Sequence, residues 1–236
     1  FRDAGIQSKA YAESSTLDGT RFGCNIGAGL ISAELNELTA AMHTARDGNR
    51  LDLRKWGESG MNQLTPLWLL KYLPNMLACH VTIIHQLKGP SNTITCADAS
   101  SHLAIGEAFR TIQRGDADQA ICGGAESKIN PMGLMRQCLL KRVNEAHNDA
   151  PESAVRPFDE DAQGTVIGEG GGLFILEEYE SAKKRGAKIY AEIVGFGASQ
   201  DTYSVTEPDP TGSSYARAIQ KALADAKIAP AEVGCV

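Results

Sequence analysis

The sequence predicts an α/β protein, because short apolar runs that suit strands alternate with stretches that have helical spacing along its 236 residues. This alternation is typical of a layered sheet covered by helices, rather than of separate helical and sheet domains. The chain shows no clear linker and no short-period repeat, so we expect one continuous α/β architecture.

The first third of the chain contains one strand–turn–helix step and then a less regular region. An apolar run at 22–30 ends in glycines and leads into a helical pattern at 31–48. Residues 47–63 are polar and contain glycine, which predicts a loop. Helical stretches follow around Pro74, and we expect this proline to begin a helix because proline is tolerated in the first turn.

The middle of the chain predicts a strand–helix–strand unit. The β-branched run at 91–96 predicts a strand, and 119–127 predicts the next one. The intervening segment, 99–114, has apolar residues nearly all round a helical projection, which indicates a buried helix. The region from there to about 155 is expected to be part helix and part loop.

The last part of the chain repeats the alternation. Residues 170–186 predict a strand and then a charged helix that ends at Gly186 as its C-cap. Residues 188–201 predict a further strand, and 213–228 predict a helix. The chain has no initiator Met and stops inside an apolar run after Pro230, which leads us to expect a fragment.

Composition excludes several classes of function. The net charge of −6 argues against nucleic acid as a partner, since phosphate binding needs a basic face. No apolar run approaches a membrane span and no signal-like segment is present, so we expect a cytoplasmic protein. The cysteines and histidines lack metal-ligand spacing, so we expect no metal and no cofactor. We expect the cysteines to be buried, reduced thiols: Cys24, Cys79, Cys96, Cys122, Cys138 and Cys235. We expect His80, His85 and His102 to be core or interface histidines.

One turn raises a chemical question. Residues 93–109, TITCADASSHLAIGEAF, place Asp98 between a β-branched run and an apolar helix. Enzymes mount nucleophiles at such turns because the unpaired N–H groups and dipole of the helix stabilise negative charge. Two interpretations stay open: Asp98 is only an N-cap, or it is a fixed anion in a seat built for a nucleophile.

Three stretches carry a family resemblance: GDADQAICGGAES at 115–127, RPFD at 156–159 with GEGGG at 168–172, and LEEYESAKKRGAKIYAE at 176–192. In this order they resemble the β-ketoacyl-acyl-carrier-protein synthases of fatty acid and polyketide synthesis. The resemblance implies a thiolase-like layered α/β sandwich of two similar halves. The chain, 1–236, would then be an incomplete domain, with 1–175 mostly the N-terminal half and 176–236 the start of the C-terminal half.

The resemblance also assigns candidate site residues. The nucleophilic cysteine of the family falls on Asp98, and Cys96 lies two residues earlier as a poor substitute. The catalytic histidine motifs of the family are absent from the chain. Trp68 falls where the family lines its acyl pocket and dimer contact, although a core tryptophan explains it equally well. Lys141 and Arg142 are candidate cations for docking the acidic acyl carrier protein, although an ordinary solvated pair explains them equally well.

Several functions remain open at this stage. Without the cysteine, the resemblance implies a chain-length-factor-like partner or a malonyl decarboxylase, and residues 162–165, AQGT, are closer to chain-length factors than to active synthases. An authentic condensing enzyme and a non-catalytic dimerisation scaffold are the alternatives. The family dimerises through the strand at 91–96, so we expect a homodimer or a heterodimer with a homologous synthase. Arg156 and Asp159 are expected to form an ion pair.

Overall fold

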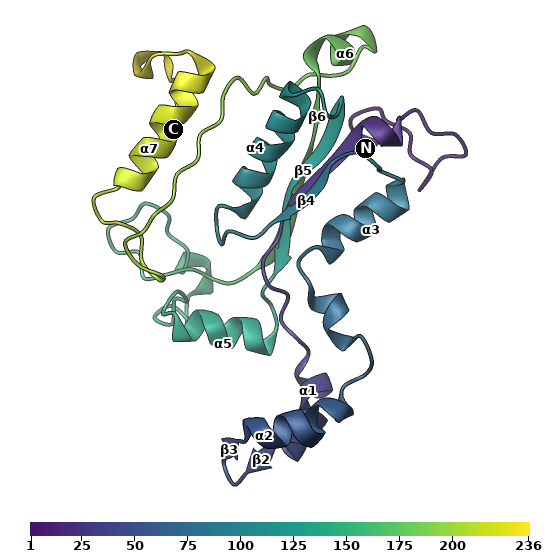
Figure 1. Cartoon of the computed structure of the whole chain (residues 1–236). Helices are drawn as coiled ribbons and strands as arrows, with labels where there is room; N and C mark the ends of the chain where they lie inside the picture. The colour runs from purple at the N-terminus through teal and green to yellow at the C-terminus, as the bar shows by residue number, and fades with distance from the viewer. The chain divides into compact units, whose positions relative to one another are not determined.

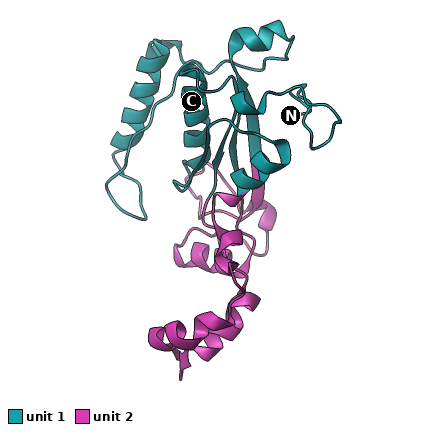
Figure 2. Cartoon of the chain, turned by 45° about the vertical axis from the view of Figure 1, so that its right-hand side comes forward, with its two compact units in different colours: residues 1–28, 77–124, 172–236 teal, residues 29–76, 125–171 magenta.

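The computed structural model describes all residues, 1–236. The chain divides into two compact units, which are coloured separately in Figure 2. We call residues 1–28, 77–124 and 172–236 the sheet unit, and residues 29–76 and 125–171 the second unit. No helix combines the length and apolar character needed to cross a membrane.

A four-stranded sheet organises the sheet unit, with strand order β4-β1-β5-β6 (Figure 1). The strands are β1 (Phe22–Gly27), β4 (Ser91–Ile94), β5 (Gln119–Ser127) and β6 (Glu169–Glu177). β1 runs parallel to both β4 and β5. β6 is antiparallel to β5, since the Glu178 N–H bonds the Asp118 carbonyl while Gly172 lies beside Gly123. The strands expected at 22–30, 91–96, 119–127 and in 170–186 are therefore confirmed.

Helices cover both faces of this sheet. On one face, Ala78 and Leu87, within and just after α3 (Met76–His85), pack against alternate residues of β1. On the other face, α4 (Ser100–Gln113) contributes Ala108, which packs against Ala120 and Cys122 of β5. The alternation of side chains along each strand places these two cores on opposite faces. The helix expected at 99–114 is confirmed, and α3 begins two residues after Pro74.

In the C-terminal part of the sheet unit, the two expected helices form but one expected strand does not. Helix α6 (Tyr179–Lys184) has Arg185 as its C-cap, and the predicted Gly186 follows one residue later with a left-handed φ of +70°, the conformation that glycine supplies after a helix. Helix α7 (Ser213–Ala226) also forms where it was predicted. Residues 188–201, however, are extended without being a strand. A strand needs ladder hydrogen bonds to a neighbour, and the sheet order includes no neighbour for this segment.

The second unit is more helical than its sequence suggested. Helix α1 (Leu35–Thr44) was predicted, but 47–63 is not a plain loop. A hairpin of β2 (Arg46–Asp47) and β3 (Arg50–Leu51) leads into it, followed by α2 (Leu53–Lys55) and further helical turns to Gln63. The Asp52 carboxylate starts this run by accepting the N–H groups of Arg54 and Lys55. Helix α5 (Pro131–Leu139) completes the unit.

The cysteines correct one expectation, and two of the histidines lie at the surface of the chain. None of the six cysteines forms a disulfide, but only Cys24 and Cys122 are buried, and burial raises the pKa of their thiols to about 11 and about 12. Cys96, Cys138 and Cys235 are exposed, because they lie outside the sheet interior. His80 and His102 are also exposed. Their helices present a solvent face at these positions.

Candidate functional site

The turn that carries Asp98 is a sharp elbow between β4 and α4. Its entry is fixed by the Thr95 hydroxyl, which donates to the Ala28 carbonyl at 2.8 Å. The next bend falls at Ala97, whose φ of +45° lies in the left-handed region that non-glycine residues rarely adopt. Surrounding contacts must hold such a residue, and backbone strain of this kind gathers at functional sites.

Ser100 supplies the contacts that hold the elbow. Its hydroxyl accepts the Cys96 N–H at 2.8 Å and donates to the Ala97 carbonyl at 2.7 Å. The side chain is only 6% exposed, so these bonds are shielded from water. One buried hydroxyl therefore ties together both residues that precede Asp98. This role escaped the sequence analysis, and the signal was a serine in the first turn of an apolar helix.

Two glycines let the start of α4 lie directly on the sheet. A Cβ added to Gly27, the last residue of β1, would lie 2.4 Å from the Ser101 nitrogen and 2.7 Å from the Ser100 oxygen. A Cβ added to Gly124 would lie 2.8 Å from the Ser101 Cβ. All three distances are shorter than real contacts of a Cβ atom allow. The elbow therefore packs directly against Gly27, the last residue of β1, and Gly124, within β5.

Asp98 itself is an exposed residue of the elbow. Ala99, one residue further, occupies the N-cap position of α4 and makes no side-chain capping bond, so Asp98 is not the N-cap residue that one interpretation expected. The carboxylate nevertheless lies at the positive end of a 14-residue helix, where negative charge is favoured. Cys96 is exposed as well, and its backbone N–H is engaged by Ser100.

Trp68 belongs to the second unit, where it takes part in a cluster around one carboxylate. The Trp68 indole N–H donates to Glu37 at 2.8 Å, the Tyr72 hydroxyl donates to the same oxygen at 2.6 Å, and the Lys71 ammonium pairs with the other oxygen. Lys71 first, and Tyr72 next, lower the pKa of the Glu37 carboxyl. We call these four residues the Glu37 clamp. It fixes the orientation of the indole against α1.

Lys141 and Arg142 lie in the second unit just after α5, and both are exposed. Lys141 has a φ of +54°, and its N–H bonds the Cys138 carbonyl as the helix ends. The Arg142 carbonyl accepts the Thr165 N–H at 2.8 Å. A Cβ at Gly164, whose φ is +114°, would lie 2.7 Å from that carbonyl oxygen, so glycine is required there.

The predicted ion pair between Arg156 and Asp159 is present but long, at 3.8 Å between half-buried groups. Arg156 also donates to the Asp161 carbonyl at 3.2 Å and lies 3.3 Å from the His147 ring. These contacts fold the RPFD segment on itself within the second unit. These contacts agree with a structural role for the motif.

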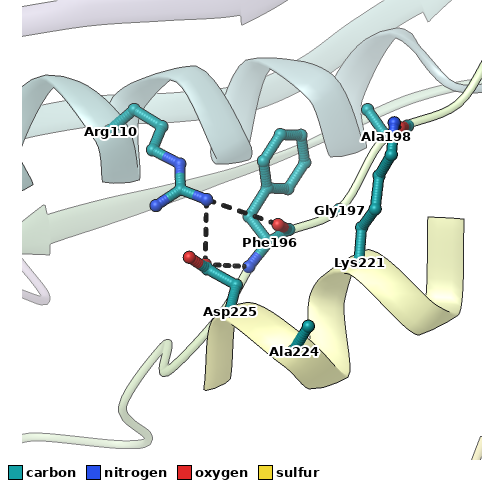
Figure 3. Close-up of a pocket in the computed structure, with 7 residues that line it drawn as sticks. All are labelled: Arg110, Phe196, Gly197, Ala198, Lys221, Ala224 and Asp225. Atoms are coloured by element: carbon teal, nitrogen blue, oxygen red, sulfur yellow. Dashed lines mark hydrogen bonds and ion pairs between the residues drawn. The ribbon is translucent and has the colours of Figure 1, made fainter. Parts of the chain in front are cut away.

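A separate open cavity of about 580 Å³ lies between α4, residues 196–198 and α7 (Figure 3). Its charged groups already have protein partners. Arg110 lies 2.9 Å from Asp225, which also accepts the Phe196 N–H at 2.8 Å, and Lys221 donates to the Ala198 carbonyl at 2.9 Å. These bonds join the three segments, so the cavity is a packing junction and the elbow is the better candidate site.

The described residues offer no place for a metal, since no three His, Cys, Asp or Glu side chains gather at one point. The site residues named from the sequence fall into two groups. Asp98 and Cys96 share the elbow of the sheet unit, whereas Trp68, Lys141 and Arg142 belong to the second unit. The Glu37 carboxylate was missed, because contacts between residues 31 or more positions apart leave no local pattern.

A mixed sheet with helices on both faces, and an elbow that leads from a strand into a buried helix, define a thiolase-like α/β fold. The model of the β-ketoacyl synthase N-terminal domain matches residues 1–182, and that of the C-terminal domain matches 190–236. The chain therefore belongs to the β-ketoacyl synthase family.

Individual relatives agree with this assignment. A 3-oxoacyl-[acyl-carrier-protein] synthase 2 of Vibrio cholerae is 37% identical over 99% of the chain and 53% of its own length. A solved ketosynthase of a type II polyketide synthase, in complex with its acyl-carrier protein, superposes with a TM-score of 0.81 at 27% identity, over 98% of this chain and 53% of that one. The ishigamide ketosynthase/chain length factor gives 0.70 at 26% identity, over 91% and 48%. The chain spans about half the length of the curated relative it matches.

Proposed function

We propose that the chain is part of a non-acylating β-ketoacyl-acyl-carrier-protein synthase homologue that works in fatty acid or polyketide synthesis. The observation that supports this proposal is the elbow: its geometry suits a nucleophile, yet Asp98 occupies the position. Such a subunit receives no acyl chain of its own. It acts beside an acylated synthase in the manner of a chain-length factor.

The chemistry of a cysteine thiolate and of the Asp98 carboxylate separates an acylated synthase from a subunit that receives no acyl chain. A thiolate attacks an acyl thioester and forms a new thioester, with the carrier thiol as the leaving group. A carboxylate that attacked the same carbonyl would form a mixed anhydride, which water cleaves rapidly. Asp98 is therefore a poor acyl acceptor, and condensation through this residue is the weaker alternative.

Partners follow from the same proposal. The carrier complex of the related polyketide ketosynthase supports an acyl carrier protein as a partner, with Lys141 and Arg142 as its docking cations. β4 is an edge strand, which supports a second subunit at that edge. The proposed location is the cytoplasm.

A second role, decarboxylation of a malonyl thioester, is open to a subunit that lacks the nucleophile. The fixed anion of Asp98 counts against it, because the malonyl carboxylate would meet a like charge. A purely structural role as a dimerisation scaffold requires that the protein has no contact with carrier-bound substrate. The acylation experiment below distinguishes the scaffold from the other roles.

The test uses the full-length protein and an acyl-loaded carrier protein, with intact-mass and peptide mass spectrometry as the readout. We expect no acyl adduct on residues 93–101 of the wild type, and an adduct on the introduced thiol of the matched variant Asp98→Cys. An adduct within 93–101 of the wild type would overturn the proposal. No adduct on the variant would show that the protein does not receive carrier-bound acyl groups, and would favour the scaffold.

A further inference from the structure

Residues 46–55 concentrate positive charge in a chain whose net charge is −6. They form the hairpin of β2 and β3 and then helix α2 of the second unit, and we call them the basic hairpin (Figure 1). The segment contains two carboxylates and four cations: Arg46, Arg50, Arg54 and Lys55. A local charge opposite in sign to that of the whole chain suits a partner that is itself anionic.

The two carboxylates of the basic hairpin already have partners within it. Asp52 is the N-cap of α2 and accepts the N–H groups of Arg54 and Lys55 at 2.8 and 3.2 Å. Asp47 pairs with the Lys55 ammonium at 3.1 Å. Neither carboxylate therefore neutralises an arginine side chain of the segment.

Two guanidinium groups are left without a counter-ion. Arg46 donates to neutral groups, the Gly48 carbonyl at 3.1 Å and the Asn49 side chain at 3.2 Å. Arg50 is exposed and forms neither an ion pair nor a hydrogen bond through its side chain. Both positive charges are thus available to an anion outside the chain.

Leucine side chains lie on one face of the basic hairpin, and the carboxylates lie on the other. Leu51 and Leu53 are 47% and 76% exposed. Asp52 between them has extended backbone, so the two leucines point to one side and the carboxylate to the opposite side. Leu51 is in register with Arg46, which places that guanidinium on the leucine face, and Asp47 follows Arg46 on the other face.

We infer that the basic hairpin is a docking surface for an anionic phospholipid membrane. Leu51 and Leu53 enter the boundary between headgroups and acyl chains, while both carboxylates stay on the water side. The Arg46 guanidinium binds lipid phosphate, because its planar fork matches phosphate oxygens. Arg50 lies beside the turn, and its long side chain reaches the headgroups from the edge of the hairpin. This inference goes beyond the proposed function and does not depend on it.

Two observations favour a lipid surface over a protein partner. A second copy docked on the same face would bring the unpaired Arg46 and Arg50 charges of both chains together, and like charges repel. A stable protein interface also needs about 20–30 residues on each side, whereas the apolar part of this face consists of Leu51 and Leu53. A membrane offers many anionic groups and requires no complementary shape.

The test is flotation of the full-length protein with vesicles of phosphatidylglycerol and phosphatidylcholine, and with vesicles of phosphatidylcholine alone. We expect binding to the anionic vesicles, and its loss when salt is raised from about 0.1 M to about 1 M. Arg50→Gln should lower the partition coefficient about fivefold, the effect of one basic residue near an anionic surface. Leu51→Ser/Leu53→Ser should lower it about tenfold or more, because the apolar contact is lost.

Lys9→Gln and Leu30→Ser are the matched controls, since both side chains are exposed outside the basic hairpin, and both variants should bind like the wild type. Circular dichroism identifies variants that retain the fold. Arg50→Gln keeps the test decisive if the double leucine variant unfolds, because the Arg50 side chain has no hydrogen bond or ion pair to lose.

A wild type that does not bind the anionic vesicles would overturn the inference, and so would binding that Arg50→Gln and Leu51→Ser/Leu53→Ser leave unchanged. Absence of vesicle binding, together with weaker binding of carrier protein or a weaker dimer in the hairpin variants, would assign the surface to a protein partner instead. None of these results concerns acylation at residue 98, so the proposed function is tested separately.

Discussion

The Ser100 hydroxyl accepts the Cys96 backbone N–H at 2.8 Å, which connects the first turn of α4 to the end of the strand before it. Through its second bond, to the Ala97 carbonyl, the same hydroxyl holds the left-handed residue next to Asp98. The position of Asp98 therefore depends on Ser100, two residues further along the chain. This dependence can be measured.

Replacing Ser100→Ala should lower the free energy of unfolding by about 1 kcal/mol, because it removes the hydroxyl that accepts the Cys96 N–H and donates to the Ala97 carbonyl. Ser101→Ala is the matched control, and it should change the stability by less than about 0.5 kcal/mol. Urea unfolding of both variants supplies the measurement. Equal stabilities would show that the hydroxyl does not hold the elbow.

Gly27→Ala should destabilise the protein by about 3 kcal/mol or more, since the new methyl group would overlap the backbone of Ser100 and Ser101 and cannot move away. Gly57→Ala is the control, because a Cβ there meets no atom within 4 Å. The control should be neutral or slightly stabilising, since alanine favours helical backbone. Thermal melts compare the two, and a Gly27 variant as stable as its control would contradict the close packing of α4 on β1.

The order of strands and helices around the elbow was predictable from local patterns. β5 begins and ends at the expected residues, and Gly186 follows the C-cap of α6. Each pattern has a local cause. The composition of residues 119–127 suits a strand, and Gly186 readily adopts the left-handed conformation that follows a helix. The position of Asp98 between β4 and α4 follows from the same reasoning.

Features that depend on distant partners were not predictable. Residues 188–201 have strand composition, but a strand forms only when a neighbour supplies hydrogen bonds. Asp52 caps a helical run in a segment whose polarity suggested a loop. The Glu37 clamp depends on contacts across the fold, which a local pattern does not encode.

The Glu37 clamp should give the second unit a dependence on acid pH. The pKa of Glu37 is lowered in the folded state, so its stabilisation is fully present above the ordinary carboxyl pKa of 4.5 and is lost as the pH falls through the folded-state value. Fluorescence of Trp68, measured in a Trp56→Phe background, should therefore change on acidification below that pH.

Glu37→Gln tests the origin of this transition. The glutamine keeps an acceptor for the indole but does not titrate, so the acid transition of Trp68 fluorescence should disappear, while the spectrum at neutral pH shifts towards that of an exposed indole as the Lys71 pairing is lost. Glu58→Gln is the control, since Glu58 pairs only with exposed Arg54. A transition that persists unchanged in Glu37→Gln would assign it to another group.

Asp98→Asn separates the charge at the elbow from its shape. The amide is close in size to the carboxylate, and Ala99 rather than residue 98 is the N-cap, so the melting temperature should change little. The charge has a larger effect on a malonyl group. Two unit charges about 4 Å apart interact by about 4 kcal/mol at an effective dielectric constant of about 20, so the Asp98 anion should oppose a malonyl carboxylate brought to the elbow.

In the full-length protein, Asp98→Asn should therefore raise the decarboxylation of malonyl-carrier protein by about tenfold or more, provided that the family's histidines are present. Carbon dioxide release and the melting temperature, measured on both forms, provide the two readouts. Faster release with an unchanged melting temperature means that the Asp98 charge opposes the malonyl group. Unchanged release with a clear loss of stability would mean that Asp98 only supports the turn, and the functional role assigned to its charge would be wrong.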